Sequence, residues 1–230
     1  MKKPVVLLLS FVGPAFAIHG AVFNFDGINT LIPDGKGSGL ADTQTLLPAQ
    51  IAGNITGLTL SLTISGVGRG GAYNGDLYAT LQHGSGFTVL LNRPGKTALD
   101  PFGYGDNGLT VTFADTPAMP DIHTYQATLG GAPGGPLTGT WSTDGRTADP
   151  AAVTDDPATR TTALTDFFGL AASGQWMLFV ADLDVGGQAR LDSWSLSIDT
   201  APVPEPQWIA LASALGLAGF AALRRFRADY

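Results

Sequence analysis

The sequence predicts an all-β protein with an antiparallel, jelly-roll-like β-sandwich, and three observations carry this prediction. The chain is rich in turn-forming residues, with 31 Gly and 15 Pro in 230 residues, and only 13% of its residues are charged. Several segments alternate apolar and polar residues with a period of two, as strands do. The acidic residues are almost all Asp, with Glu205 the only Glu, and Asp favours turns. One sandwich between two terminal processing segments accounts for the chain.

The segment 174–198 contains the clearest pair of strands. Apolar side chains occupy every second position from Trp176 onward and again from Trp194 onward, with an Asp-rich stretch between them. The glycine pair 186–187 suits a turn with positive φ. We therefore expect a long hairpin with one Trp on each arm, and buried rings of this size would dominate the core.

Further strands are expected upstream of this segment. Residues 58–64 alternate Leu or Ile with Ser or Thr, which predicts a half-buried strand with one apolar face and one hydroxyl face. The other expected strands span 77–81, 87–91 and 109–113. Glycine- and proline-rich residues 130–136 are typical of a loop, and 138–162 show little periodicity, so we expect a loop there with at most one short helical turn.

These motifs together resemble the P domain, the jelly-roll β-sandwich that lies beside the catalytic domain in proprotein convertases and many bacterial subtilisin-like proteases. The resemblance rests on Gly-Asp-Leu at 75–77, Leu-x-x-Phe-x-Gly at 164–169, the Gly-x-Trp-x-Leu-x-Val-x-Asp strand from Gly174, and Leu-x-x-Trp-Ser-Leu at 191–196. It covers about residues 22–199. It implies a role in stabilising a protease or positioning its substrate, although the 230 residues contain no recognisable α/β protease domain.

Residues 1–17 have the three features of a secretory signal peptide, in the right order. Two lysines precede a short apolar run, and Ala15 and Ala17 satisfy the small-x-small rule for cleavage. We expect signal peptidase to cleave after Ala17, so that the sandwich domain spans 18–200.

Residues 201–230 contain Pro204-Glu205-Pro206, an apolar run and a basic cluster, in that order. The basic residues are Arg224, Arg225 and Arg227. This tail closely resembles the PEP-CTERM sorting segment that exosortase recognises in Gram-negative bacteria. The resemblance implies transient anchoring in the inner membrane with the arginines on the cytoplasmic side, cleavage near the Pro-Glu-Pro, and delivery to the cell surface or extracellular matrix. The alternative is an uncleaved single-span anchor.

Charge and cysteine content narrow the function classes. The formal net charge is −7, and removing the two basic ends would leave a more acidic domain, which disfavours a nucleic-acid partner. Cysteine is absent, so the chain has no disulfide framework and no thiolate ligands for zinc or iron.

Calcium is the metal that the sequence favours. Calcium binds carboxylate and carbonyl oxygens, and Asp residues in turns are a common source of them. The P-domain resemblance places Asp76, Asp115 and Asp182 near strand ends, where some bacterial P domains bind calcium, and Asp184 adds a second carboxylate beside Asp182. The alternative stays open that these side chains cap turns by accepting hydrogen bonds from backbone N–H groups.

No catalytic constellation is recognisable in the sequence. His83-Gly84-Ser85 resembles a subtilisin His segment superficially, but the chain lacks the nucleophile turn and the alternating βαβ pattern that such an enzyme needs. We expect His83 and His123 to be loop or edge residues, and we predict that the protein is not an enzyme.

The sequence therefore predicts a non-catalytic module of the cell surface or matrix with a structural or adhesive role. One alternative is a carbohydrate-binding module that contacts extracellular polysaccharide, since jelly rolls present aromatic residues and Asp to sugars. Its candidate stacking residues are Tyr73, Tyr78, Tyr104 and Tyr125. A second alternative is an accessory domain that acts with a separate subtilisin-like protease.

Overall fold

The computed structural model describes residues 19–68, 70–201, 215–216 and 218–220. Its strands are β1 (His19–Phe25), β2 (Thr30–Leu31), β3 (Lys36–Leu46), β4 (Asn54–Val67), β5 (Leu77–His83), β6 (Gly86–Asn92), β7 (Leu109–Phe113), β8 (Leu137–Trp141), β9 (Gly174–Asp182) and β10 (Gln188–Ala201). The short helices are η1 (Asn74–Asp76), η2 (Ile122–Thr124), α1 (Tyr125–Leu129), η3 (Pro157–Thr159) and η4 (Leu164–Phe167).

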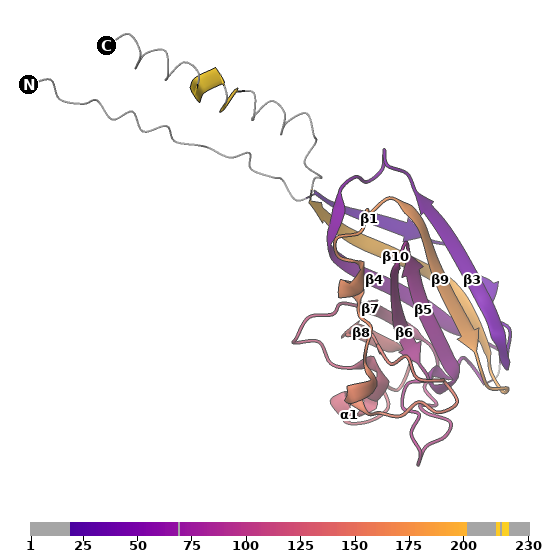
Figure 1. Ribbon diagram of the computed structural model, residues 1–230. Coiled ribbons are helices and arrows are strands. Elements are labelled where there is room, and N and C mark those ends of the chain that lie inside the picture. Colours follow the sequence, from indigo (N-terminus) through magenta and orange to yellow (C-terminus); the bar gives the residue numbers. More distant parts are fainter. Residues whose placement is uncertain (1–18, 69, 202–214, 217, 221–230) are drawn as a thin grey trace, which may run out of the picture.

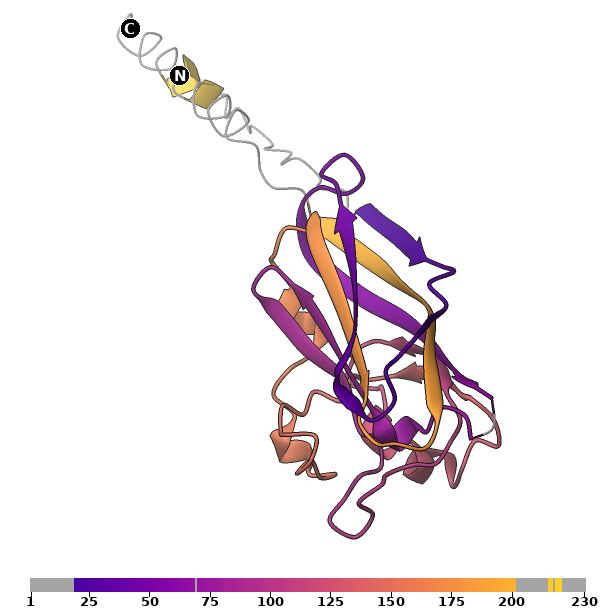
Figure 2. The ribbon, with the colours of Figure 1, turned by 90° about the vertical axis from the view of Figure 1, so that its right-hand side faces the viewer.

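Two sheets pack face to face, as Figures 1 and 2 show from two directions. One sheet has six strands in the order β1-β10-β4-β7-β8, with β2 also paired to β10, and the other has four in the order β3-β9-β5-β6. The predicted all-β sandwich is confirmed. The predicted signal peptide, Pro204-Glu205-Pro206 and the arginine cluster lie outside the described residues. Within the described ranges, no helix is long and apolar enough to span a membrane.

The core lies between the two sheets and contains the predicted aromatic residues. Trp176 on β9 and Trp194 on β10 are 0% and 1% exposed, and along β4 buried Leu and Ile residues alternate with half-buried Ser and Thr residues. The opposite face of β4 carries the predicted hydroxyl groups. They continue across the sheet in register, with Ser61 facing Ser195 on one side and Thr112 on the other.

The expected hairpin between β9 and β10 is wrong, although both strands exist. β9 lies between β3 and β5 in the four-stranded sheet, whereas β10 lies between β1 and β4 in the six-stranded sheet. The connection from Leu183 to Gly187 therefore crosses from one sheet to the other. Alternation along the chain predicts which side chains are buried, but it does not say which strands pair, and the two Trp side chains meet the core from opposite layers.

The region 138–162 differs from the prediction only at its start, since residues 142–162 form a loop with one short helical turn, η3, as expected. Residues 137–141 form β8, which pairs in parallel with β7, so the sheet is not wholly antiparallel. A parallel pair needs a crossover connection, and the segment with α1 supplies it. β8 is an edge strand that buries only Leu137 and Trp141, which is why its alternation is weak in the sequence.

Strand pairing places the beginning and the end of the sandwich together. His19 pairs with Thr200, so the chain enters and leaves the domain at one end (Figure 1). The β9–β10 connection lies at the other end, since β10 runs the length of the sandwich from Gln188 to Ala201. We call the end with this connection the loop end.

Candidate functional site

Four carboxylates and one arginine gather at the loop end, and we call this group the acidic cluster. It consists of Asp34, Asp76, Asp182, Asp184 and Arg93, which pairs with two of the carboxylates. The Arg93 guanidinium pairs with Asp184, and its Nη2 lies 3.5 Å from Oδ1 of Asp76. Its Nε donates to the carbonyl of Gly75 at 2.9 Å. Since Arg93 is only 6% exposed, its charge is held in place between the carboxylates.

The ends of neighbouring strands position these side chains. Asp182 is the last residue of β9 and pairs with Leu77, the first residue of β5, directly after Asp76. The N–H of Leu183 donates to the carbonyl of Asp76 at 2.9 Å, which ties the two connections together. Asp34 precedes β3, whose first residue also pairs with Asp182. Three connections therefore converge on one point.

Burial and mutual repulsion disfavour the charged forms of two members. Burial raises the pKa of Asp182 to about 7, and the charges of Asp76 and Asp34 add to the rise. Burial also raises the pKa of Asp76 to about 6, with the charge of Asp184 adding to the rise and Arg93 opposing it. One guanidinium thus does not neutralise the cluster.

The carboxylate oxygens of the cluster are the ligand type that a hard cation prefers, but the side chains are too far apart to bind one together. Oδ1 of Asp34 and Oδ1 of Asp182 are buried without a hydrogen-bond partner, which is costly for a carboxylate oxygen and is the environment that a cation would satisfy. Across the part of the chain that the structure describes, however, no three His, Cys, Asp or Glu side chains are close enough to hold a metal ion. Calcium binding would require the carboxylates to draw together.

Asp115, the fourth residue predicted for calcium, acts as a turn cap elsewhere in the fold. Its carboxylate accepts hydrogen bonds from the N–H of Thr143 at 2.9 Å and from the N–H of Leu164 at 2.6 Å. The Thr143 hydroxyl also donates to it, at 2.9 Å. The structure therefore brings Asp76, Asp182 and Asp184 together, whereas Asp115 joins the β7 end to two other loops.

A pocket of about 340 Å³ opens beside the acidic cluster. Its walls are Tyr73, Asp76, Phe102, Gly103, Tyr104, Gly105, Asp184 and Val185. We call it the aromatic pocket. Two of the four tyrosines proposed for sugar stacking therefore lie here. Tyr78 packs instead against Phe179, with the ring centroids 6.4 Å apart, and Tyr125 is fully buried.

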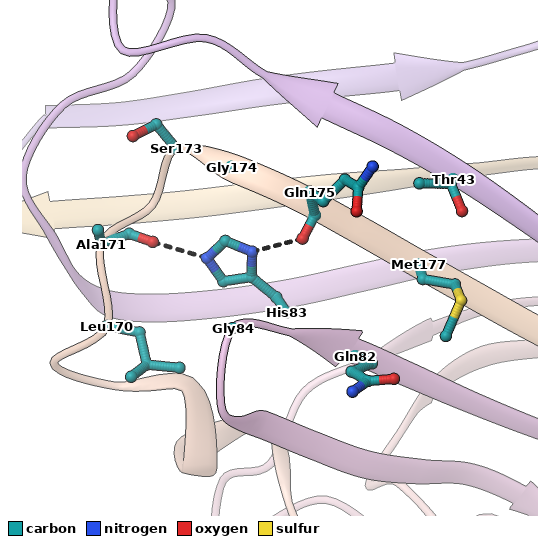
Figure 3. A pocket seen from close by; sticks show the side chains of 10 residues that line it. All are labelled: Thr43, Gln82, His83, Gly84, Leu170, Ala171, Ser173, Gly174, Gln175 and Met177. Atoms are coloured by element: carbon teal, nitrogen blue, oxygen red, sulfur yellow. Dashed lines mark hydrogen bonds between the residues drawn. The ribbon is translucent and has the colours of Figure 1, made fainter.

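A larger hollow of about 570 Å³ lies at the opposite end of the four-stranded sheet. Figure 3 shows His83 among the residues that line it. Both ring nitrogens of His83 are engaged, Nδ1 with the carbonyl of Gln175 at 2.7 Å and Nε2 with the carbonyl of Ala171 at 2.6 Å. The ring stacks on Trp176 with the centroids 4.0 Å apart. His83 therefore joins β5 to β9 and to the segment before it, and neither nitrogen points freely into the hollow.

His123 is likewise part of a buried network. Its Nδ1 lies 2.8 Å from the Asp144 carboxylate, and its Nε2 lies 3.1 Å from the carbonyl of Lys96. Arg146 pairs with the same Asp144 at 3.2 Å and with Asp121 at 2.8 Å. This network fixes the segment after β8, which the sequence predicted to be a loop.

Sequence reasoning missed Asp34, Arg93 and Phe102. Asp34 lies in the Pro-Asp-Gly stretch that marks a turn, and the same pattern can supply a ligand, so a signal existed. Arg93 lies in Asn-Arg-Pro-Gly, where nothing distinguishes a buried ion-pair partner from a solvent-exposed arginine. Phe102 has no periodicity around it and becomes notable only because its loop leaves it 70% exposed.

No protein-family model matches the chain, and no curated protein matches it significantly. Among solved structures, the complex of the Aeromonas sobria serine protease with its chaperone ORF2 matches with 15% identity and a TM-score of 0.41, over 83% of this chain and 28% of that chain. The structure of the Aeromonas sobria serine protease matches with 15% identity and a TM-score of 0.40, over 81% and 27%. The chain spans less than a third of the length of those it matches. A likeness at this level carries no inference about function.

Proposed function

We propose that this protein is a non-catalytic, exported module with a P-domain-like jelly-roll fold, sorted by exosortase to the cell surface or extracellular matrix, where it has a structural or adhesive role. One observation carries the proposal. Because the chain enters and leaves the sandwich at the same end, a C-terminal anchor would hold that end and direct the loop end away from the membrane. The loop end also contains the acidic cluster and the aromatic pocket.

The histidine geometry supports the absence of catalysis in this proposal. A general base needs a ring nitrogen within reach of the proton that it removes. His83 and His123 each engage both nitrogens with acceptors inside the fold, so their hydrogen bonds are explained by structure. Ser85 belongs to the His83-Gly84-Ser85 segment that resembles a subtilisin His segment. In the described structure it makes no hydrogen bond to His83.

Calcium at the acidic cluster is part of the proposal. Asp76, Asp182 and Asp184 would hold the ion, with Asp34 as a further oxygen donor. Bound there, calcium would supply the positive charge that the single guanidinium of Arg93 does not, and it would join three loops of the sandwich. The buried oxygens without partners on Asp34 and Asp182 support this assignment.

Surface labelling tests the proposal directly. In a bacterium that has an exosortase, intact cells should bind an antibody against the sandwich, and deletion of the exosortase should retain the protein in the inner membrane. Glu205→Ala should have the same effect as the deletion, with Asp229→Ala as the matched control in the same tail. Surface exposure that is unaffected by both changes would contradict exosortase sorting.

A carbohydrate-binding module remains the second candidate function. One observation favours it: Tyr73, Tyr104 and two carboxylates line the same pocket. This pocket lies at the loop end, which a C-terminal anchor would direct away from the membrane.

A further inference from the structure

The aromatic pocket is formed by three connections that are far apart in the sequence. Tyr73 and Asp76 come from the β4–β5 connection, Phe102 and Tyr104 from the β6–β7 connection, and Asp184 and Val185 from the β9–β10 connection. Its volume of about 340 Å³ lies in the range of small-ligand sites. It is a hollow in the folded domain.

Phe102 stands exposed on a loop that is braced from within. The Thr97 hydroxyl accepts the N–H of Asp100 at 2.9 Å, and Lys96 Nζ donates to the carbonyl of Pro101 at 2.6 Å. The N–H of Tyr104 bonds to the carbonyl of Pro94 at 2.9 Å. An aromatic ring that is 70% exposed on an ordered loop forgoes the stabilisation that burial would give, so it is available to a ligand without a large ordering cost.

Gly75 shows how closely this loop is fitted to its neighbour. A Cβ at Gly75 would lie 2.2 Å from the carbonyl oxygen of Phe102, so only glycine allows the two backbones to approach. The N–H of Gly75 donates to the carbonyl of Tyr104 at 2.8 Å. The backbone from Phe102 to Tyr104 is therefore held against η1, which fixes where the Phe102 side chain leaves the chain.

The chemistry of the walls selects the ligand class. Aromatic rings offer a flat face to C–H groups, and carboxylates accept hydrogen bonds from hydroxyl groups. An anionic ligand would be repelled by Asp76 and Asp184, and a purely apolar one would bury these carboxylates without partners. An organic cation such as oligolysine would have to displace the Arg93 guanidinium, which already pairs with both carboxylates. A neutral sugar satisfies both kinds of wall, since it has an apolar face and hydroxyl edges.

We propose that the aromatic pocket binds a sugar ring of a neutral polysaccharide, with Phe102 against the ring and Asp184 accepting from its hydroxyl groups. Asp184 is the accessible carboxylate, with 42% of its side chain exposed, whereas the Asp76 side chain is 9% exposed. The assignment rests on the proposed function only in that the loop end faces outward, and it does not require calcium.

Binding of defined oligosaccharides to the full chain, purified in detergent and immobilised, tests this proposal. The probes are hexasaccharides of glucose, mannose and N-acetylglucosamine as neutral ligands, with oligogalacturonate and oligolysine as anionic and cationic ones. At least one neutral probe should bind, and Phe102→Ala should weaken its binding about tenfold. Phe168→Ala is the matched control, because Phe168 is 43% exposed and lies near η4, away from the pocket.

The outcomes separate this proposal from calcium binding, because each measurement is made in calcium and in chelator. Neutral-sugar binding that Phe102→Ala weakens and Phe168→Ala preserves supports the proposal, whatever calcium does to stability. Binding of none of the neutral probes overturns it, as does equal weakening by both Phe variants. Preference for oligogalacturonate or oligolysine also overturns it. Matching thermal melts of the variants and the wild type confirm that exposed Phe102 is not needed for folding.

Discussion

His83 shows what a single residue does in this fold. Two hydrogen bonds to carbonyls and a stack on Trp176 make it a cross-link within the four-stranded sheet. Because the ring is largely buried, removing it takes a polar partner away from these carbonyl oxygens.

We predict that His83→Ala lowers the free energy of unfolding by about 2 to 4 kcal/mol. Urea denaturation measures the change. Ser85→Ala, at an exposed neighbouring position, should stay within about 0.5 kcal/mol of the wild type. Equal stability of His83→Ala and Ser85→Ala would show that the hydrogen bonds of the ring contribute nothing.

The sequence left two roles open for its Asp residues, calcium ligand and turn cap, and Asp115 and Asp182 differ in which role they fit. Asp115 accepts hydrogen bonds from three donors in two other loops, at 2.6 to 2.9 Å. Two of these donors are backbone N–H groups, so Asp115 is a cap. Asp182 has an oxygen with no donor. The sequence could place both at strand ends, but it could not show which of them would find a donor in a loop dozens of residues away.

We predict that Asp115→Ala destabilises the protein by about 2 kcal/mol, equally in calcium and in chelator, because it removes caps and not ligands. Parallel urea denaturations in the two buffers measure this. A loss of stability confined to the calcium buffer would instead identify Asp115 as a ligand.

At the scale of the elements, β3 shows that a long strand can contain glycine residues. Gly37 and Gly39 lie near its start, yet the structure has one strand from Lys36 to Leu46 with an irregular register between Lys36 and Leu40. Gly39 lies at φ +50, and a Cβ added there would lie 2.6 Å from the Phe179 ring. The glycine is therefore a packing residue within the strand, which alternation could not reveal.

We predict that Gly39→Ala destabilises the protein by about 2 kcal/mol or more, because a Cβ there would lie 2.5 Å from the carbonyl oxygen of Val180 and in an unfavourable φ region. Gly37→Ala is the control, since its Cβ would meet only Leu183, at 3.9 Å. Thermal melts of the two variants should therefore diverge. Coincident melts would refute the packing role of Gly39.

The strand ends that meet at the acidic cluster give stability a defined dependence on pH. The folded-state pKa values of Asp182 and Asp76, about 7 and 6, lie above the ordinary value of 3.8. The folded state therefore binds more protons than the unfolded state between about pH 4 and pH 7. The stabilisation is present at low pH and is lost as pH rises through the folded-state pKa values.

In chelator, we predict that the free energy of unfolding is lower at pH 8 than at pH 5, because Asp76 and Asp182 become charged between these pH values. Urea denaturation at the two pH values measures the change, and Asp182→Asn should make it smaller because the amide does not titrate. Asp166→Asn, at an exposed position within η4, serves as the control, since the amide can still accept the N–H of Ala163. A pH dependence identical in wild type and Asp182→Asn would contradict the assignment to Asp182.

At the scale of the whole molecule, the sequence predicted the fold class and the burial of both Trp side chains, because alternation reports which side faces the core. It did not predict the pairing, since β9 and β10 separate into different sheets and β8 joins β7 in parallel. The acidic cluster was predicted in part, through Asp76, Asp182 and Asp184. Arg93 and Asp34 complete it through tertiary contacts that leave no local pattern.

The two ends of the chain carry a further prediction at this scale. Intact-mass analysis of the exported protein should give a chain that begins at Ile18 and lacks everything beyond about Pro206, because the terminal segments resemble a signal peptide and a sorting tail. A Glu205→Ala chain provides the comparison. Full-length protein that still carries Arg227 in the extracellular fraction would contradict cleavage.

Calcium-dependent stability tests the central claim, that the acidic cluster at the loop end is a cation site, most directly. Melts of the full chain at pH 8 in calcium and in chelator should differ by about 5 °C at a hundredfold excess of calcium over its Kd, since binding to the folded state alone stabilises by about 2.7 kcal/mol. Asp182→Asn should reduce the difference, whereas Asp166→Asn should preserve it. Coincident melts of the wild type in the two buffers would contradict the claim.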